Sequence, residues 1–277
     1  MNRNTRLKGL ITHLYFLRSE MLLKKKLHAK LVESCSNESH AYHGETSKDQ
    51  YDVYGERELV EYETGSGRVL KDGRLATMPY KAVRDVYVQP VKDAVSAMLE
   101  SQEGEGSGPL KILEVGCGNA TNLKLLKEAF GDRVALYGID ISANRIAVGQ
   151  KYWGERIAGI DLRQADATAL SMFDDSSFDL VYSVCALEQI TYRLHEAVGE
   201  MVRVGKGKLV LVEPVFEFGN KVQRLYNIVG DQCRTLIPEL KSFDLDVAEK
   251  GLMPVLHYPL NPVGLLVAEK RTGKKSV

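Results

Sequence analysis

The chain has 277 residues, with 37 Lys and Arg against 37 Asp and Glu, 44% hydrophobic residues and 27% charged residues. These proportions are typical of a globular protein, and they exclude wholesale disorder, a collagen-like chain and a coiled coil. A net charge of zero argues against a nucleic-acid-binding protein, which would need a basic excess. The four cysteines lie far apart and form no C-x-x-C pair. They predict reduced thiols in a cytoplasmic protein rather than a disulfide framework or a metal site.

The first 33 residues are basic, with eight Lys and Arg against two Glu. Leu7, Leu10, Leu14 and Leu17 recur at helical spacing, which predicts one or two amphipathic helices. Charged residues interrupt the apolar stretch, so it does not read as an export signal or as a membrane span. Such a helix either packs on its own domain or on a second copy of the chain, or it lies on an anionic membrane surface.

A connector rich in Gly, Ser and Pro over residues 101–109 predicts the main boundary in the chain. Residues 1–108 are therefore expected to form an N-terminal helical cap region, and residues 109–277 the main domain. The cap contains several tyrosines and a predicted helix over 90–99, with Pro90 tolerated in its first turn because no backbone donor is needed there.

Beyond the connector, short β-rich runs alternate with helical runs. The predicted strands cover 111–115, 134–141, 161–165, 179–185 and 208–213, and the predicted helices cover 120–130, 143–153 and 193–204. Alternating strands and helices predict an α/β fold with a doubly wound, Rossmann-like, mostly parallel sheet. The last two runs, 254–258 and 264–269, have no room between them for a crossover helix. They are expected to pair as an antiparallel C-terminal hairpin.

The first strand of this domain runs into a glycine-rich turn, which reads Glu114-Val-Gly116-Cys117-Gly118-Asn-Ala120-Thr121. In open α/β sheets ligands bind at this end of the strands, and small residues let the backbone approach them. A dinucleotide fingerprint needs Gly or Ala where Thr121 stands. Glu114, expected at the mouth of the turn, would oppose a pyrophosphate and would suit a cationic ligand with an amino group.

These residues resemble the first motif of the class I S-adenosylmethionine-dependent methyltransferases, acid-x-Gly-x-Gly-x-Gly, with Ala120 in place of the third glycine. That replacement is expected only to tighten the turn. The resemblance continues in chain order through the ends of the next strands, over residues 83–270, and it implies S-adenosylmethionine as the cofactor. The implied ribose contact is Asp140, the implied adenine contact is Asp166, and the loop at Ser183 is implied to hold the methionine part. The full set of implied binding residues is Glu114, Gly116, Cys117, Gly118, Asp140, Ile141, Asp166, Ala167 and Ser183.

The resemblance also implies methyl transfer to a small-molecule or sugar-like acceptor, on oxygen or nitrogen. The nucleophile must then lie in line behind the methyl group, about 3–3.5 Å away. A hydroxyl acceptor needs a base, for which the candidates are Glu188, His195 and Glu213. The candidate substrate residues in the cap are Tyr51, Tyr54 and Tyr80.

Three alternatives stay open at this point. The acceptor could be a lipid or a lipid-linked glycan, presented at a membrane that the basic N-terminal helix touches. The domain could instead be a Rossmann NAD-dependent oxidoreductase, which the Thr121 position disfavours. It could also be a non-catalytic module that binds the nucleoside cofactor or a partner.

Overall fold

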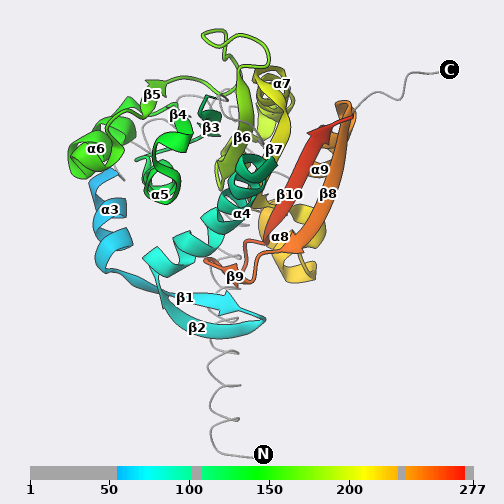
Figure 1. Cartoon of the computed structure of the whole chain (residues 1–277). Helices are drawn as coiled ribbons and strands as arrows, with labels where there is room; N and C mark the ends of the chain where they lie inside the picture. The colour runs from blue at the N-terminus through cyan, green and yellow to red at the C-terminus, as the bar shows by residue number, and fades with distance from the viewer. Residues whose placement is uncertain (1–54, 102–107, 230–234, 272–277) are drawn as a thin grey trace, which may run out of the picture.

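The computed structural model describes residues 55–101, 108–229 and 235–271 of the chain. Its larger sheet has seven strands in the order β5-β4-β3-β6-β7-β10-β8, which cross the view in Figure 1. The strands are β3 (Leu110–Val115), β4 (Val134–Asp140), β5 (Asp161–Gln164), β6 (Phe178–Val184), β7 (Gly205–Pro214), β8 (Leu245–Leu252) and β10 (Val263–Lys270). The first five of these in the sequence pair in parallel, whereas β10 pairs antiparallel with both β7 and β8. The predicted fold class is confirmed.

Successive strand residues point to opposite faces of the sheet, and each face has its own hydrophobic core. Ile112 and Leu180 belong to the first core, whereas their neighbours Leu113 and Val181 belong to the second. The first core also receives side chains from α4 (Tyr80–Ser101), α5 (Thr121–Phe130) and α6 (Ala143–Trp153). The second receives them from α7 (Leu194–Val204) and α9 (Leu236–Ser242). Both faces of the central strands are therefore covered by helices, as the near-continuous apolar runs predict.

The described part of the cap region is not purely helical, which corrects one expectation. Between α3 (Gly55–Thr64) and α4 lies a hairpin of β1 (Ser66–Lys71) and β2 (Arg74–Pro79), at the lower edge of Figure 1. Asp72 and Gly73 form its turn with φ of +48° and +73°. Asp-Gly is the residue pair that such two-residue turns favour, so this signal was present in the sequence. The predicted basic helices of residues 1–33 lie outside the described residues.

The C-terminal hairpin exists, but its strands differ from the predicted ones. β10 pairs with β8, whereas Val255–Leu256 (β9) pairs antiparallel with β1 in a small sheet of order β2-β1-β9. β8 is an edge strand of the larger sheet, and most of its side chains are exposed. Its sequence is therefore polar, and a search for apolar runs does not find it. The strand β9 links the C-terminal part of the chain to the cap region.

Helix α4 begins ten residues earlier than predicted, so that Pro90 lies in its interior rather than in its first turn. Proline removes one helical hydrogen bond, which normally favours a break. Here Val83, Val88, Val91 and Val95 are buried along the helix on both sides of Pro90. This packing against the sheet outweighs the local preference. No helix in the described ranges is long and apolar enough to span a bilayer.

The first core joins α3 to the sheet, and this gives a test of whether the cap region and the main domain unfold together. Leu59 of α3 is fully buried, whereas its neighbour Val60 is 56% exposed. Leu59→Ala is expected to destabilise the whole protein by about 2–5 kcal/mol through the cavity it leaves, in a single denaturation transition. Val60→Ala is the control and should change the free energy of unfolding by less than about 0.5 kcal/mol. A separate early transition in the Leu59 variant would show that α3 is not part of the common core.

Candidate functional site

The turn after β3 has a backbone that bends around an open space at the carboxyl end of the sheet. Gly116 and Gly118 have φ of +76° and +53°, and the backbone N–H groups of Gly116 and Cys117 both donate to the carbonyl of Ile139, at 2.9 and 2.8 Å. Ala120 is also left-handed, with φ of +60°. A side chain in this region costs roughly 1–2 kcal/mol, so Ala120 strains the turn rather than merely tightening it. The two glycines adopt positive φ readily, so the strain in this loop lies at Ala120.

Asp140, at the end of β4, holds this loop in place. One oxygen of its carboxylate accepts the N–H of Gly118 at 2.8 Å, and the other accepts the N–H of Ser142 at 2.9 Å. The side chain is 5% exposed and borders the cavity described below. A carboxylate with two backbone donors keeps further lone pairs for a ligand. Its position is compatible with the predicted ribose contact, which stays a prediction.

Helix α6 packs on the loop through a face that the sequence interpretation missed. Arg145, Gly149 and Trp153 recur every four residues, so they share one side of the helix. A Cβ on Gly149 would lie 2.3 Å from the carbonyl oxygen of Asn119, and the indole of Trp153 donates to that same oxygen at 3.0 Å. The spacing of four residues between Arg145, Gly149 and Trp153 could have indicated this packing face from the sequence.

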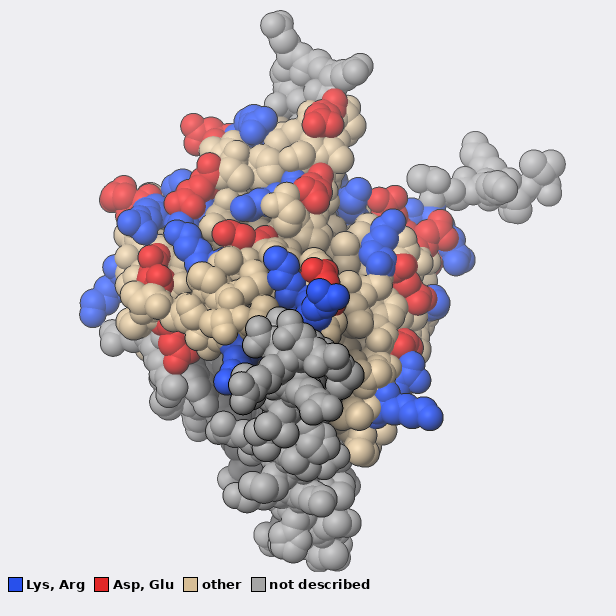
Figure 2. Space-filling model, turned by 90° about the horizontal axis from the view of Figure 1, so that it is seen from below, with Lys and Arg blue, Asp and Glu red and all other residues tan. Residues whose placement is uncertain are grey.

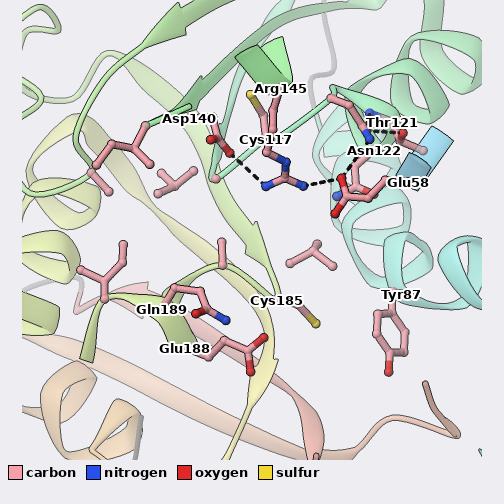
Figure 3. Close-up of a pocket in the computed structure, with 18 of the residues that line it drawn as sticks. Glu58, Tyr87, Cys117, Thr121, Asn122, Asp140, Arg145, Cys185, Glu188 and Gln189 are labelled. Atoms are coloured by element: carbon pink, nitrogen blue, oxygen red, sulfur yellow. Dashed lines mark hydrogen bonds and ion pairs between the residues drawn. The ribbon is translucent and has the colours of Figure 1, made fainter. Parts of the chain in front are cut away.

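Arg145 connects the loop region to the cap region, as Figure 3 shows. Its guanidinium lies 3.7 Å from the Asp140 carboxylate and 2.9 Å from the carboxylate of Glu58 in α3. Asn119 also donates to Glu58, at 3.3 Å. Helix α3 is therefore attached to the loop by an ion pair and a hydrogen bond, and it forms one wall of the site.

A cavity of about 820 Å³ opens between these elements. Its walls come from the ends of β3, β4 and β6, from α3 and α4, and from the segment after β9. The predicted site residues that border it are Gly116, Cys117, Asp140, Ile141, Asp166, Ala167, Glu188 and Tyr80. The predicted site residues among the described ones that do not border it are Glu114, Gly118, Ser183, His195 and Glu213.

Glu114 does not lie at the mouth of the turn, contrary to expectation. Its carboxyl is fully buried beneath the loop and accepts the amide N–H of Asn122 at 2.6 Å. Burial raises the pKa of this carboxyl to about 7, so the group is partly protonated at neutral pH. Glu114 therefore supports the loop from below and can act on a bound cation only through space.

At the predicted adenine position, Asp166 is already engaged on both sides. One oxygen accepts the backbone N–H and the hydroxyl of Thr168, at 2.9 and 2.7 Å. The other pairs with Arg193 at 3.1 Å. Thr168 and Ile141 line the cavity beside it. The adenine contact of Asp166 stays a prediction.

The loop after β6 lies opposite the glycine-rich loop, and Glu213 at the end of β7 fixes it. The carboxylate of Glu213 accepts the N–H of Ala186 at 3.0 and 3.1 Å, and burial raises its pKa to about 7. The two loops lie so close that a Cβ on Gly116 would come within 2.3 Å of the Ala186 methyl. Glu213 is thus a positioning residue, and Cys185 and Ala186 border the cavity in place of Ser183.

Of the three candidate bases, Glu188 alone borders the cavity. Its carboxylate accepts the amide N–H of Asn261 at 3.0 Å, and desolvation raises its pKa. His195 lies elsewhere: its side chain is 65% exposed, bonded to Glu239 at 2.9 Å and stacked on Phe243. The expectation that His195 acts as a base is therefore wrong on grounds of position.

The far end of the cavity is lined largely by aromatic side chains. Tyr80 contacts the ring of His257 edge-on, with centroids 4.9 Å apart, and His257 in turn stacks beside Tyr258. The hydroxyl of Tyr87 accepts the backbone N–H of His257 at 3.0 Å. Burial lowers the pKa of His257, so this ring is neutral at physiological pH. Tyr51 and Tyr54 lie outside the described residues, and nothing in the sequence singled out Tyr87 or His257.

With this geometry in place, comparison with known proteins identifies a domain in the middle of the chain. The family model described as a methyltransferase domain matches residues 113–211, which include the glycine-rich loop, Asp140, Asp166 and the loop after β6. The chain therefore contains a methyltransferase domain, and its motifs resemble those of the class I S-adenosylmethionine-dependent methyltransferases. The matched range contains the glycine-rich motif that resembles this family.

Curated relatives of this chain are named as methyltransferases of quinone biosynthesis. It is 34% identical over 106 residues to a demethylmenaquinone methyltransferase of Bacillus cereus, which covers 37% of this chain and 44% of the relative. It is 29% identical over 162 residues to the ubiquinone/menaquinone biosynthesis C-methyltransferase of Xanthomonas campestris, which covers 52% and 63%. The chain thus spans about half the length of the curated relatives it matches.

Solved structures share the fold at low identity. Magnesium protoporphyrin IX methyltransferase from Synechocystis, with bound S-adenosylmethionine, gives a TM-score of 0.57 at 16% identity over 85% of this chain and all of that one. The [4+2]-cyclase SpnF gives 0.56 at 19% identity over 82% and 96%. A cyclase among these neighbours means that the fold alone does not establish methyl transfer.

The two N–H bonds and the cavity position of Asp140 predict that its charge contributes to cofactor affinity. Asp140→Asn keeps the size of the side chain but removes the negative charge. Hydrogen bonds to charged groups contribute about 1.5–3 kcal/mol, so the affinity for S-adenosylhomocysteine should fall roughly ten- to a hundredfold by calorimetry. Asp161→Asn, at an exposed ion pair on β5, is the control. Equal affinities in both variants would contradict the assignment of Asp140.

The raised pKa of Glu213 predicts a pH dependence of stability. The folded-state pKa of about 7 exceeds the unfolded value of 4.5, so Glu213 stays protonated to a higher pH in the folded state than in the unfolded state. Stability from this group is fully present below about pH 4.5 and is lost as the pH rises through 7. Glu213→Gln keeps an acceptor for Ala186 and cannot ionise. Between pH 5 and pH 8 the wild type should lose a few kcal/mol more unfolding free energy than the variant. Parallel pH profiles in urea denaturation would contradict this cause.

Proposed function

We propose that this protein transfers a methyl group from S-adenosylmethionine to a planar aromatic small molecule. The observation that carries the proposal is the continuity of the cavity. It runs from Asp140 and Asp166 at one end to Tyr80 and His257 at the other. A methyl donor and an acceptor can therefore occupy one continuous cavity, which transfer requires.

The aromatic end of the cavity revises the expected acceptor. A sugar-like acceptor needs many polar partners, whereas Tyr80, Val83 and Tyr87 offer flat and apolar surfaces. The curated relatives named for quinone methylation support the same class of acceptor. They also favour carbon as the atom methylated, beside the oxygen or nitrogen expected from the sequence.

The chain's own residues supply binding, orientation and one proton acceptor. S-adenosylmethionine, when bound, supplies a methyl group already activated by a sulfonium. Asp140 and Asp166 would hold its ribose and adenine, and the loops at Gly116 and Ala186 would hold its methionine part. The acceptor atom would take up this methyl group, and the electron pair of the broken carbon–sulfur bond would stay on sulfur. The acceptor's proton would then pass to the carboxylate of Glu188, which borders the cavity and whose pKa is raised by burial.

Methyl transfer is tested with S-adenosylmethionine labelled in the methyl group and a panel of hydroxylated naphthalenes and quinols. We expect label in one class of aromatic product, which mass spectrometry would detect and nuclear magnetic resonance would place on carbon or oxygen. Conversion of an acceptor without loss of the cofactor's methyl group would indicate chemistry like that of the cyclase neighbour. Absence of label from every acceptor would contradict the proposed class.

The role of Glu188 is tested separately. Glu188→Gln should lower kcat at least tenfold, because general-base catalysis contributes about 10²–10⁴-fold. It should leave the affinity for S-adenosylhomocysteine within about twofold. Glu155→Gln, an exposed change far from the cavity lining, is the control. If kcat is unchanged in the Glu188 variant, the acceptor's proton leaves by another route.

A second candidate is a methyltransferase that takes a lipid-like acceptor from a membrane surface. One feature favours it: α8 (Lys221–Val229) exposes Val222, Leu225 and Ile228 while carrying basic but no acidic residues. Gln223 of this helix donates to the carbonyl of Pro259 at 2.9 Å, next to Tyr258 at the cavity. Helix α8 thus lies beside the aromatic end, with its apolar face exposed. On the face shown in Figure 2, acidic and basic side chains are interspersed.

Flotation of the full chain with vesicles containing phosphatidylglycerol tests this second candidate. Binding that Leu225→Glu abolishes and Val60→Glu leaves intact would support it, since Val60 is an exposed apolar residue on α3. Loss of methyl transfer to a soluble quinol in the same variant would point to a folding defect instead. Wild-type protein that does not float would remove the candidate.

A further inference from the structure

Three arginines line the cavity, and two of them have carboxylate partners in the protein. Arg145 pairs with Glu58 and Asp140, and Arg193 pairs with Asp166. The third, Arg84 of α4, has no carboxylate within ion-pair distance in the part of the chain that the structure describes, nor does its guanidinium stack on an aromatic ring there. An Arg that is partly withdrawn from water without a partner is costly, so a partner supplied by a ligand would be stabilising.

Arg84 belongs to the aromatic end of the cavity. Tyr80 precedes it by four residues and Tyr87 follows it by three, so all three share one face of α4. Its positive charge acts on three groups across the cavity. At Tyr87 and Cys185 burial raises the pKa and the charge of Arg84 partly offsets that rise. At His257 burial lowers the pKa and the charge of Arg84 lowers it further. The remaining charged groups that border this end are Glu61 and Glu188. Arg84 is therefore the cation of the acceptor end, and the other two arginines belong to the cofactor end.

We propose that Arg84 binds an anionic oxygen of the acceptor, either a carboxylate or an ionised hydroxyl on a flat aromatic ring. This inference rests on the proposed function and specifies its substrate class. The planar guanidinium presents a fork of donors that matches a carboxylate and can equally serve a single oxyanion. The aromatic walls at Tyr80 and His257 would hold the ring, and Arg84 would fix its direction. A neutral analogue of the same shape would lose this contact.

The test uses the full chain saturated with S-adenosylhomocysteine and three probes of one shape: 2-naphthoate, 2-naphthol and 2-naphthamide. Binding is measured by calorimetry in the wild type, Arg84→Gln, Arg84→Lys and Lys81→Gln. Lys81 is an exposed residue on the same helix and does not border the cavity, so its variant is the matched control for loss of one positive charge. The titration with S-adenosylhomocysteine comes first and reports on cofactor binding independently.

The wild type and the Lys81 variant should bind at least one anionic probe tenfold or more tighter than the amide, as a charged hydrogen bond predicts. Arg84→Gln should erase that preference while leaving the affinity for S-adenosylhomocysteine unchanged, and Arg84→Lys should restore part of it. Tight naphthoate binding identifies the carboxylate. Naphthol binding that strengthens with pH, in the wild type and not in the glutamine variant, identifies the ionised hydroxyl.

Two results would overturn the inference and leave cofactor binding intact. One is a wild type that binds the anionic probes no tighter than the amide, and the other is an anion preference that survives in Arg84→Gln. Failure of the wild type to bind S-adenosylhomocysteine would instead contradict the proposed function itself.

Discussion

The carboxylate of Asp140 is the group around which the site is built. Its oxygens accept the N–H groups of Gly118 and Ser142, so one side chain fixes the loop after β3 and the start of α6 at the same time. That loop contains a strained residue, Ala120, which would relax if the anchor were lost. Arg145 extends the same network to Glu58, and through it α3 becomes a wall of the cavity. The shape of the cofactor end thus depends on one buried charge and its donors.

Charges in the site are divided between support and recognition. Glu114 and Glu213 are buried under the two loops, where burial raises the pKa of each to about 7. They hold backbone and side-chain donors and do not reach the cavity. Asp140, Asp166 and Glu188 face it. A positively charged ligand at the cofactor end would favour ionisation of Glu114 through space, so proton release would accompany its binding.

The sequence was sufficient for the main sheet because hydrophobic periodicity marks buried parallel strands and their crossover helices clearly. It was weaker where structure depends on distant partners. β8 is half exposed and its polar sequence gave no strand pattern, whereas β9 is a strand only because β1 lies beside it. Pro90 suggested a helix start, but tertiary packing carried α4 past it. The Asp72-Gly73 turn could have been recognised and was not.

The residues of the site also differ in how well the sequence predicts them. Gly116, Asp140 and Asp166 follow strands in fixed order, so a motif places them. Tyr87, Arg84 and His257 come from α4 and from the segment after β9, and only the folded chain brings them together. Proximity to a strand end in the sequence was not sufficient to find a base, because the exposed side chain of His195 is bonded to Glu239 on the surface. Residues that recognise the acceptor are thus less predictable than those that bind the cofactor.

We infer that the glycine-rich loop and Asp140 bind a methyl donor rather than a dinucleotide. The most direct measurement is equilibrium binding of S-adenosylhomocysteine and of NAD, side by side, to the full wild-type chain at neutral pH. We expect saturable binding of S-adenosylhomocysteine with a one-to-one stoichiometry and no measurable binding of NAD at the same concentrations. Saturable NAD binding without binding of S-adenosylhomocysteine would contradict it.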